Sequence, residues 1–282
     1  MRATGIAGLA APSLQTHSSP NGPSSQRDAL AHQMTLTFVP LLQIQRDLYA
    51  LPRNMERFSA YIETMTDAST NDLKLPLVAM NPMGKEHVAT LLDEWMALGA
   101  DDIGARAVAD AEIRLQDVSG EFRVGLVIAD DLKGGWTNRC TYEFADRFAT
   151  KALHRRGWLT GMLWTSESPS ADAAREAVAT SVYRASYIEQ HGYAHSLREM
   201  IAQEAYAMAN AKCTGPSLDA DDLAYTREAI AAHLDAIDHA TIIACLFGDN
   251  AAAELGHARR GFSDRAGLAL ARAGWNQGSA TA

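Results

Sequence analysis

The sequence predicts an α/β fold, with a small, mostly parallel sheet and helical crossovers, followed by an all-helical C-terminal half. Short apolar runs alternate with segments at helical spacing through the middle of the chain, as expected for parallel strands joined by helices. The run Arg123–Ala129 is apolar and rich in β-branched residues without alternation, which is typical of a strand buried on both faces. From residue 171 to residue 272 only helical spacing is found.

The first part of the chain combines a polar stretch with the first regular elements. Residues 1–33 are rich in Ser, Pro, Asn and Gln and predict a disordered tail, and ordered structure is expected from Leu36–Leu42 onward. Asn54 is expected to cap a helix. Leu75–Met80 is predicted to be a strand, with Pro76 at its start or on a sheet edge.

The middle part predicts strands that alternate with helices. Helices are expected over residues 88–96 and Ile103–Leu115, and then Arg123–Ala129 forms a strand. Thr137 is expected to cap the next helix, and Trp158–Thr165 is predicted to be the following strand.

The C-terminal half begins with Ser170 as a predicted helix N-cap, and Asp172 lies in the first turn. The helices expected there are Ala171–Gln190, Ser196–Lys212, Asp221–Leu234, Thr241–Leu255 and Asp264–Arg272, with breaks at Gly192, Gly215-Pro216, Gly248 and Gly261. Glu204 falls on an apolar helical stripe, so its carboxylate must be paired or neutral. Arg184 is the expected structural partner.

These elements divide the chain into four predicted regions. They are a tail over residues 1–33, an α/β sheet domain over 34–169, a helical region over 170–273 that packs on or caps the sheet, and a tail over 274–282. An alternative start of the natural chain at Met34 stays open at this point.

The composition excludes several classes of partner. The chain has 282 residues and a net charge of −9, from 25 Lys and Arg against 34 Asp and Glu. An acidic protein of this kind argues against nucleic acid and against anionic membrane surfaces. Three cysteines without close spacing argue against a disulfide framework or a zinc site, and predict a reduced, cytoplasmic environment.

Polar loops follow three of the predicted strands. They are residues 81–87, 130–139 and 165–168. Because ligands of open parallel sheets bind beyond the carboxyl ends of the strands, we expect these loops to meet on one rim and to form the site.

The second loop has the features of an anion site. Gly134 and Gly135 allow the backbone to approach a ligand, and the following helix would offer free N–H groups. Residues expected to bind the substrate are Asn81, Lys85, Lys133, Gly134, Gly135, Thr137, Asn138, Arg139 and Ser166. The alternative is a glycine-rich turn before a capped helix, without a ligand.

Carboxylates and one histidine are the candidate catalytic groups. Asp130 and Asp131 are expected to hold a divalent metal or to act as a base, and only one of them needs to face the rim because adjacent strand residues alternate. Glu86 or His87 would move protons, and Glu167 would assist. The alternatives are capping or salt-bridging aspartates and a surface histidine.

The functional hypothesis is an enzyme that acts on a small anionic metabolite, phosphorylated or carboxylated, by hydrolysis or group transfer, with the helical half closing over the rim. The other hypothesis is a non-catalytic protein that binds a ligand or a partner through the same rim or through the helical half, which could also mediate oligomer formation. The carboxylates distinguish the two, since an anion-binding protein gains nothing from Asp130, Asp131 and Glu167 beside its ligand.

Overall fold

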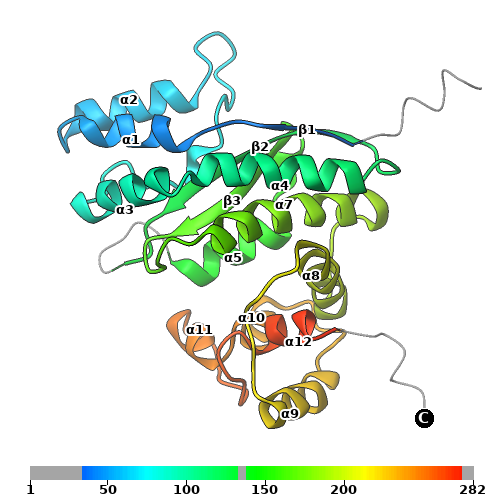
Figure 1. The fold of residues 1–282 in the computed structure, drawn as a ribbon. Helices are drawn as coiled ribbons and strands as arrows, with labels where there is room; N and C mark the ends of the chain where they lie inside the picture. Colours follow the sequence, from blue (N-terminus) through cyan, green and yellow to red (C-terminus); the bar gives the residue numbers. More distant parts are fainter. Residues whose placement is uncertain (1–33, 133–137, 275–282) are drawn as a thin grey trace, which may run out of the picture. The chain divides into compact units, whose positions relative to one another are not determined.

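Three parallel strands form the sheet, in the order β1-β2-β3 (Figure 1). The structure, a computed structural model, describes residues 34–132 and 138–274, all of which lie in the unit His32–Ala282. The strands are β1 (Met34–Phe38), β2 (Gly120–Ala129) and β3 (Trp158–Trp164). The predicted fold class, a small parallel sheet with a helical C-terminal half, is confirmed.

The central strand β2 carries the core. Its residues 124–129 are all buried, because β1 and β3 flank it and helices cover it. This agrees with the apolar, non-alternating pattern that predicted the strand. Register brings Val124 opposite Leu159 and Ala129 opposite Trp164, so β2 and β3 end side by side.

Two long helices, α4 (Ala100–Arg114) and α7 (Ala171–His191), pack against each other on one face of the sheet (Figure 1). Gly161 allows α7 to approach β3 closely, because a Cβ atom there would lie 3.0 Å from the backbone of Ala177 and Val178. The first helix of the C-terminal half is therefore also a layer of the α/β sheet.

The N-terminal helices cover the end of the sheet where the strands finish. They are α1 (Leu42–Ala50), α2 (Met55–Met65) and α3 (Glu86–Ala97). Asn54 caps α2 as predicted, since its side chain accepts a hydrogen bond from the N–H of Glu56.

The predicted strand Leu75–Met80 is wrong. Leu77–Ala79 form a short 3-10 helix, η2, after Pro76, and Leu77 and Met80 are fully buried while Val78 is exposed. The run is apolar because it contributes to the core. The place beside β2 in the sheet is taken by β1, all of whose residues pair with β2.

Helix α5 (Arg139–Phe148) begins one residue later than a Thr137 cap would give. Its N-cap is Asn138, whose side chain accepts a hydrogen bond from the N–H of Thr141, whereas Thr137 lies outside the described residues. The short helix α6 (Lys151–His154) leads into β3. Ser170 caps α7 as predicted, and Asp172 lies in the first turn.

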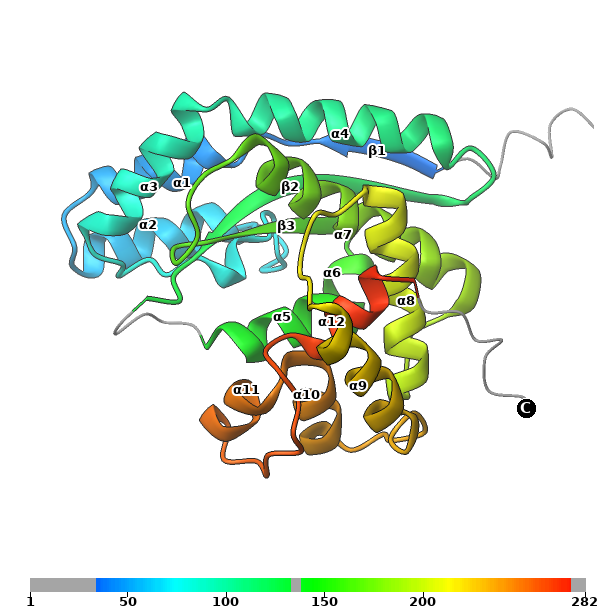
Figure 2. The same ribbon diagram turned by 60° about the horizontal axis from the view of Figure 1, so that its bottom comes forward.

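The remaining helices form a second hydrophobic core around Leu197, Ile243 and Leu268. They are α8 (Leu197–Ala211), α9 (Ala220–Ala231), α10 (His239–Phe247), α11 (Asp249–Glu254) and α12 (Ala266–Arg272). The predicted helix Thr241–Leu255 is divided at Gly248, where φ is 92°. Helix α5 lies between the sheet and the helices α10 and α11 (Figure 2).

Within residues 34–132 and 138–274, none of the helices combines the length and the apolar character needed to span a membrane.

Candidate functional site

The three polar loops meet beyond the carboxyl ends of β2 and β3, although the first of them follows the 3-10 helix η2 and not a strand. Asn81 follows η2, Asp130 follows β2 and Thr165 follows β3, and all three side chains are buried. Asn81 Nδ2 donates to Asp130 Oδ2 at 3.0 Å, and Thr165 Oγ1 donates to Asp130 Oδ1 at 3.1 Å. Asp130 therefore joins the loops, and we call Asn81, His87, Asp130, Asp131, Thr165 and Ser166 the rim cluster.

His87 contacts Asp130 directly. Its Nε2 lies 2.9 Å from Asp130 Oδ1, and its side chain is 33% exposed whereas that of Asp130 is 3% exposed. His87 is the second residue of α3, so the helix fixes its backbone next to the end of β2. The result is a partly exposed imidazole oriented by a buried carboxylate.

Tyr49 supports this arrangement from α1. Its hydroxyl donates to the carbonyl oxygen of Asn81. Burial raises the pKa of Tyr49, and the nearby charge of Asp130 raises it further, so the phenol stays a hydrogen-bond donor.

Asp131 also lies on the rim, although adjacent strand residues were expected to diverge. Its carboxylate accepts hydrogen bonds from the N–H of Ser166 at 2.9 Å and from Ser166 Oγ at 2.6 Å, and its own backbone N–H donates to Thr165 Oγ1 at 3.0 Å. The alternation of strand residues does not extend to this pair, because β2 ends at Ala129 and both aspartates lie beyond it. Asp131 thereby fixes the loop that follows β3.

Arg139 is surrounded by carboxylates. It pairs with Glu143 at 2.9 Å, with Glu167 and with Asp131 at 3.6 Å, and it donates to Ser166 Oγ at 3.1 Å. These anions compensate its charge, so an anionic ligand would have to displace one of them. Asp131 and Glu167, which were predicted to be catalytic groups, are thus ion-pair partners of Arg139.

The other predicted site residues take no part in the rim cluster. Lys85 and Glu86 are exposed at the start of α3, and Asn138 uses its side chain to cap α5. Lys133, Gly134 and Gly135, like Thr137, lie outside the described residues.

The metal hypothesis receives no support from the geometry. Among the residues that the structure describes, no group of three or more His, Cys, Asp and Glu side chains is placed to hold a metal ion. The oxygens of Asp130 and Asp131 instead accept hydrogen bonds from protein donors.

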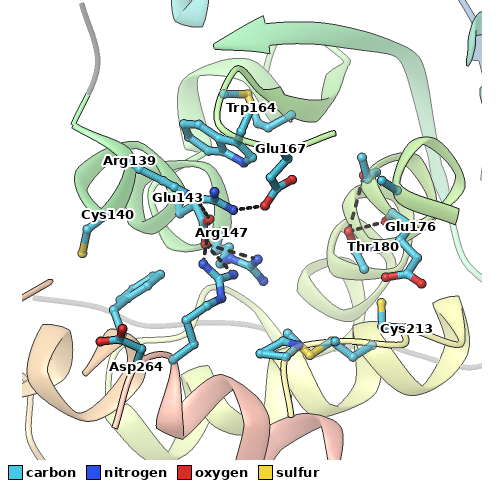
Figure 3. Close-up of a pocket in the computed structure, with 18 of the residues that line it drawn as sticks. Arg139, Cys140, Glu143, Arg147, Trp164, Glu167, Glu176, Thr180, Cys213 and Asp264 are labelled. Carbon is cyan, nitrogen blue, oxygen red and sulfur yellow. Dashed lines mark hydrogen bonds and ion pairs between the residues drawn. The ribbon is translucent and has the colours of Figure 1, made fainter. Parts of the chain in front are cut away.

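A second feature, which the sequence did not predict, is a cavity of about 730 Å³ (Figure 3). Its walls come from α5, the end of β3, the first half of α7, Met208 of α8, residues 213–216, α10, α11 and residues 264–265 just before α12. Trp164 and Glu167 lie on one side of it, Glu176 and Thr180 on another, and Asp264 on a third. Cys140 and Cys213 also line it, and burial raises the pKa of each thiol to about 12.

Glu143 anchors the wall of the cavity. Arg265 donates to both of its carboxylate oxygens at 2.9 Å, and Arg139 and Arg147 approach at 2.9 and 3.5 Å. Burial raises the pKa of Glu143, but the arginines outweigh this effect and lower it to about 2. The carboxylate is therefore ionised at neutral pH.

Glu204 extends this network into α8. It is fully buried, and Arg184 donates to it at 2.7 Å, as the sequence predicted, while Arg147 pairs with its other oxygen. The sequence did contain a signal for Glu143 and Arg147, since both charges share a helix face with Cys140 and Phe144, where apolar residues are expected. Arg265 carried no such signal.

No protein family model, curated protein or solved structure matches the chain.

Proposed function

We propose that the chain is an enzyme in which His87 transfers a proton during hydrolysis or group transfer on a small polar metabolite. The observation that supports this proposal is the 2.9 Å contact between the partly exposed His87 and the buried Asp130. A base oriented by a second group that is itself held in place is a recurrent arrangement in acid–base catalysis.

The hydrogen bonds assign a role to each nitrogen of His87. Because a carboxylate oxygen accepts, Nε2 is the donor toward Asp130, and Nδ1 is left as the basic nitrogen of the partly exposed ring. Asn81 and Thr165 hold both oxygens of Asp130 and thereby fix the direction of the imidazole. In the proposed reaction, Nδ1 takes a proton from the attacking group and returns it to the leaving group.

The rim position supports the proposal as well, because open α/β sheets bind ligands beyond the carboxyl ends of their strands. The charge of the substrate is left open, since Arg139 is compensated by carboxylates. The proposal names no metal, because the aspartates that were its predicted ligands bind the protein instead.

The test is a substrate screen with four purified proteins. Wild type, His87→Gln, Asp130→Asn and the control His195→Gln are incubated with panels of esters, amides, phosphate esters and acyl donors, and turnover is followed by mass spectrometry. His195 is exposed, so its loss leaves the rim unchanged. We expect at least one substrate whose turnover falls by about 10²-fold or more in the first two variants and stays unchanged in the control.

A double variant adds a second criterion. If His87 and Asp130 act as one unit, the double variant is no slower than the slower single variant. Turnover that survives both single substitutions, or a panel without any turnover by wild type, would refute the proposal.

A further inference from the structure

The cavity beside the rim has the properties of a ligand site of its own. Its volume of about 730 Å³ lies in the range of small-molecule pockets, about 300–1,000 Å³. Trp164, Met162, Met208 and Phe247 supply apolar wall, and polar groups interrupt it. None of His87, Asp130 and Asp131 lines it, so it is separate from the proposed catalytic group.

The formal charges around the cavity are predominantly negative. Among the described residues, its lining contains six carboxylates against three guanidiniums. The carboxylates are those of Glu143, Glu167, Asp172, Glu176, Glu254 and Asp264, and the guanidiniums are those of Arg139, Arg147 and Arg265.

The lining arginines are already neutralised. Arg265 makes its two hydrogen bonds to Glu143, and Arg147 pairs with Glu143 and with the buried Glu204. Arg139 is paired with Glu143 and Glu167. An anionic ligand would therefore find no uncompensated cation among the described lining residues.

Asp172 and Glu176 pair with Arg175 at 3.5 and 3.1 Å. Two exposed carboxylates, Glu254 and Asp264, are left to carry the remaining charge. Within the described chain, neither has an ion-pair partner within 4.0 Å, and Asp264 accepts a single hydrogen bond, from Asn250 at 2.9 Å. An excess of charge of one sign around a concave site attracts ligands of the opposite sign. Trp164 adds an aromatic group at the wall; it is 4% exposed, and the guanidinium of Arg139 lies over its ring, 5.0 Å from the centroid.

We propose that this cavity binds a small organic cation, an amine or guanidine attached to an apolar group. The apolar part would contact Trp164 and Met162, and the cationic part would lie toward Glu254 and Asp264. This inference is independent of the proposed function, because it involves neither His87 nor Asp130.

The experiment compares ligands that differ only in charge. Tryptamine, indole-3-acetamide and indole-3-acetate are titrated into the full-length protein, together with a fragment library sorted into amines, neutral compounds and carboxylates, and binding is followed by ligand-observed NMR. We expect tryptamine to bind at least about threefold more tightly than the neutral amide, and amines to be enriched among the fragments. Binding of the cations should weaken as NaCl is raised from about 0.05 to 0.5 M.

Matched variants locate the binding. Glu254→Gln combined with Asp264→Asn should weaken tryptamine binding at least about threefold. The control pair Glu63→Gln and Glu94→Gln removes two exposed carboxylates of α2 and α3 and should have no effect. Ala173→Trp should fill the cavity and abolish binding, whereas Ala109→Trp, at an exposed position of α4, should not.

Several outcomes would overturn the proposal. They are equal or tighter binding of the carboxylates, amine binding that ignores the Glu254 and Asp264 substitutions, and a screen in which no amine fragment competes for the cavity. Circular dichroism of each variant shows whether it is folded. If Ala173→Trp does not fold, the charge-substituted pair decides the question by itself.

Discussion

Replacing Glu143 by Gln tests whether the buried charge network stabilises the fold. The side chain of Glu143 is 5% exposed, and it is the common partner of Arg139, Arg147 and Arg265. Glutamine has a similar shape but no charge, so the three guanidiniums lose their shared anion. Removing one member of a buried ion pair leaves uncompensated charge and typically costs about 3–5 kcal/mol.

The pKa of Glu143 gives an independent magnitude and a pH dependence. It falls from 4.5 to about 2 on folding, and each unit corresponds to about 1.4 kcal/mol, so the ionised carboxylate contributes about 3 kcal/mol at pH 7. Because the folded pKa is depressed, this stability is fully present above pH 4.5 and is lost as the pH falls toward 2. At pH 3 about 1 kcal/mol should remain.

The assay is urea denaturation of wild type and Glu143→Gln at pH 7, 5, 4 and 3, followed by circular dichroism. The difference in unfolding free energy should be about 3 kcal/mol at pH 7 and should shrink below pH 4.5. Glu254→Gln, which removes an exposed carboxylate, is the control and should differ from wild type by less than about 0.5 kcal/mol. A Glu143 difference below 1 kcal/mol at pH 7, or one independent of pH, would refute the reasoning.

Two further predictions concern the sheet and its surroundings. Gly125→Ala should lower the unfolding free energy by about 1–3 kcal/mol in urea denaturation, because its Cβ would lie 2.5 Å from Leu41 Cδ1 and 3.0 Å from the carbonyl oxygen of Val39; a loss under 0.5 kcal/mol would contradict this. Burial, with a smaller contribution from Arg184, lowers the pKa of His154 to about 4. Because the unfolded chain takes up this proton at a higher pH than the folded protein, the free energy of unfolding should fall by about 3 kcal/mol as the pH is lowered from 6.5 to 4. In His154→Gln this part of the pH dependence should be absent. An NMR titration that places His154 near its ordinary pKa would show the reasoning to be wrong.

The sequence predicted two kinds of element: a strand with the same buried environment on both faces, and helix starts that depend on interactions between residues close in sequence. The strand Arg123–Ala129 was found because it is buried on both faces, and the helix caps Asn54 and Ser170 were found because capping is a local interaction. Leu75–Met80 was assigned to a strand because a short apolar run does not distinguish a strand from a buried turn of helix.

The meeting of the second and third loops followed from a topological rule, since the parallel neighbours β2 and β3 end on the same side. The first loop joins them for a reason that the rule does not contain, because Asn81 follows the 3-10 helix η2 and bonds to Asp130. The detailed partners of the loops did not follow from the rule. Nothing local to Asp130 specifies that His87, 43 residues earlier, will lie at 2.9 Å. The cavity was not predictable for the same reason, because its walls come from segments whose relative positions depend on how the two cores pack.

The position of Arg265 in the sequence determines when the contacts of Glu143 can all form during synthesis. Arg265 follows Glu143 by 122 residues, so β3 and α7 to α11 have been synthesised before this guanidinium exists. Among the described residues, Arg139 and Arg147, both from its own helix, are the ion-pair partners that Glu143 has before that point. The buried charge network can therefore close only after Arg265 has been synthesised. A fragment that stops before Arg265 would carry the cavity wall without the contact that joins α5 to the beginning of α12.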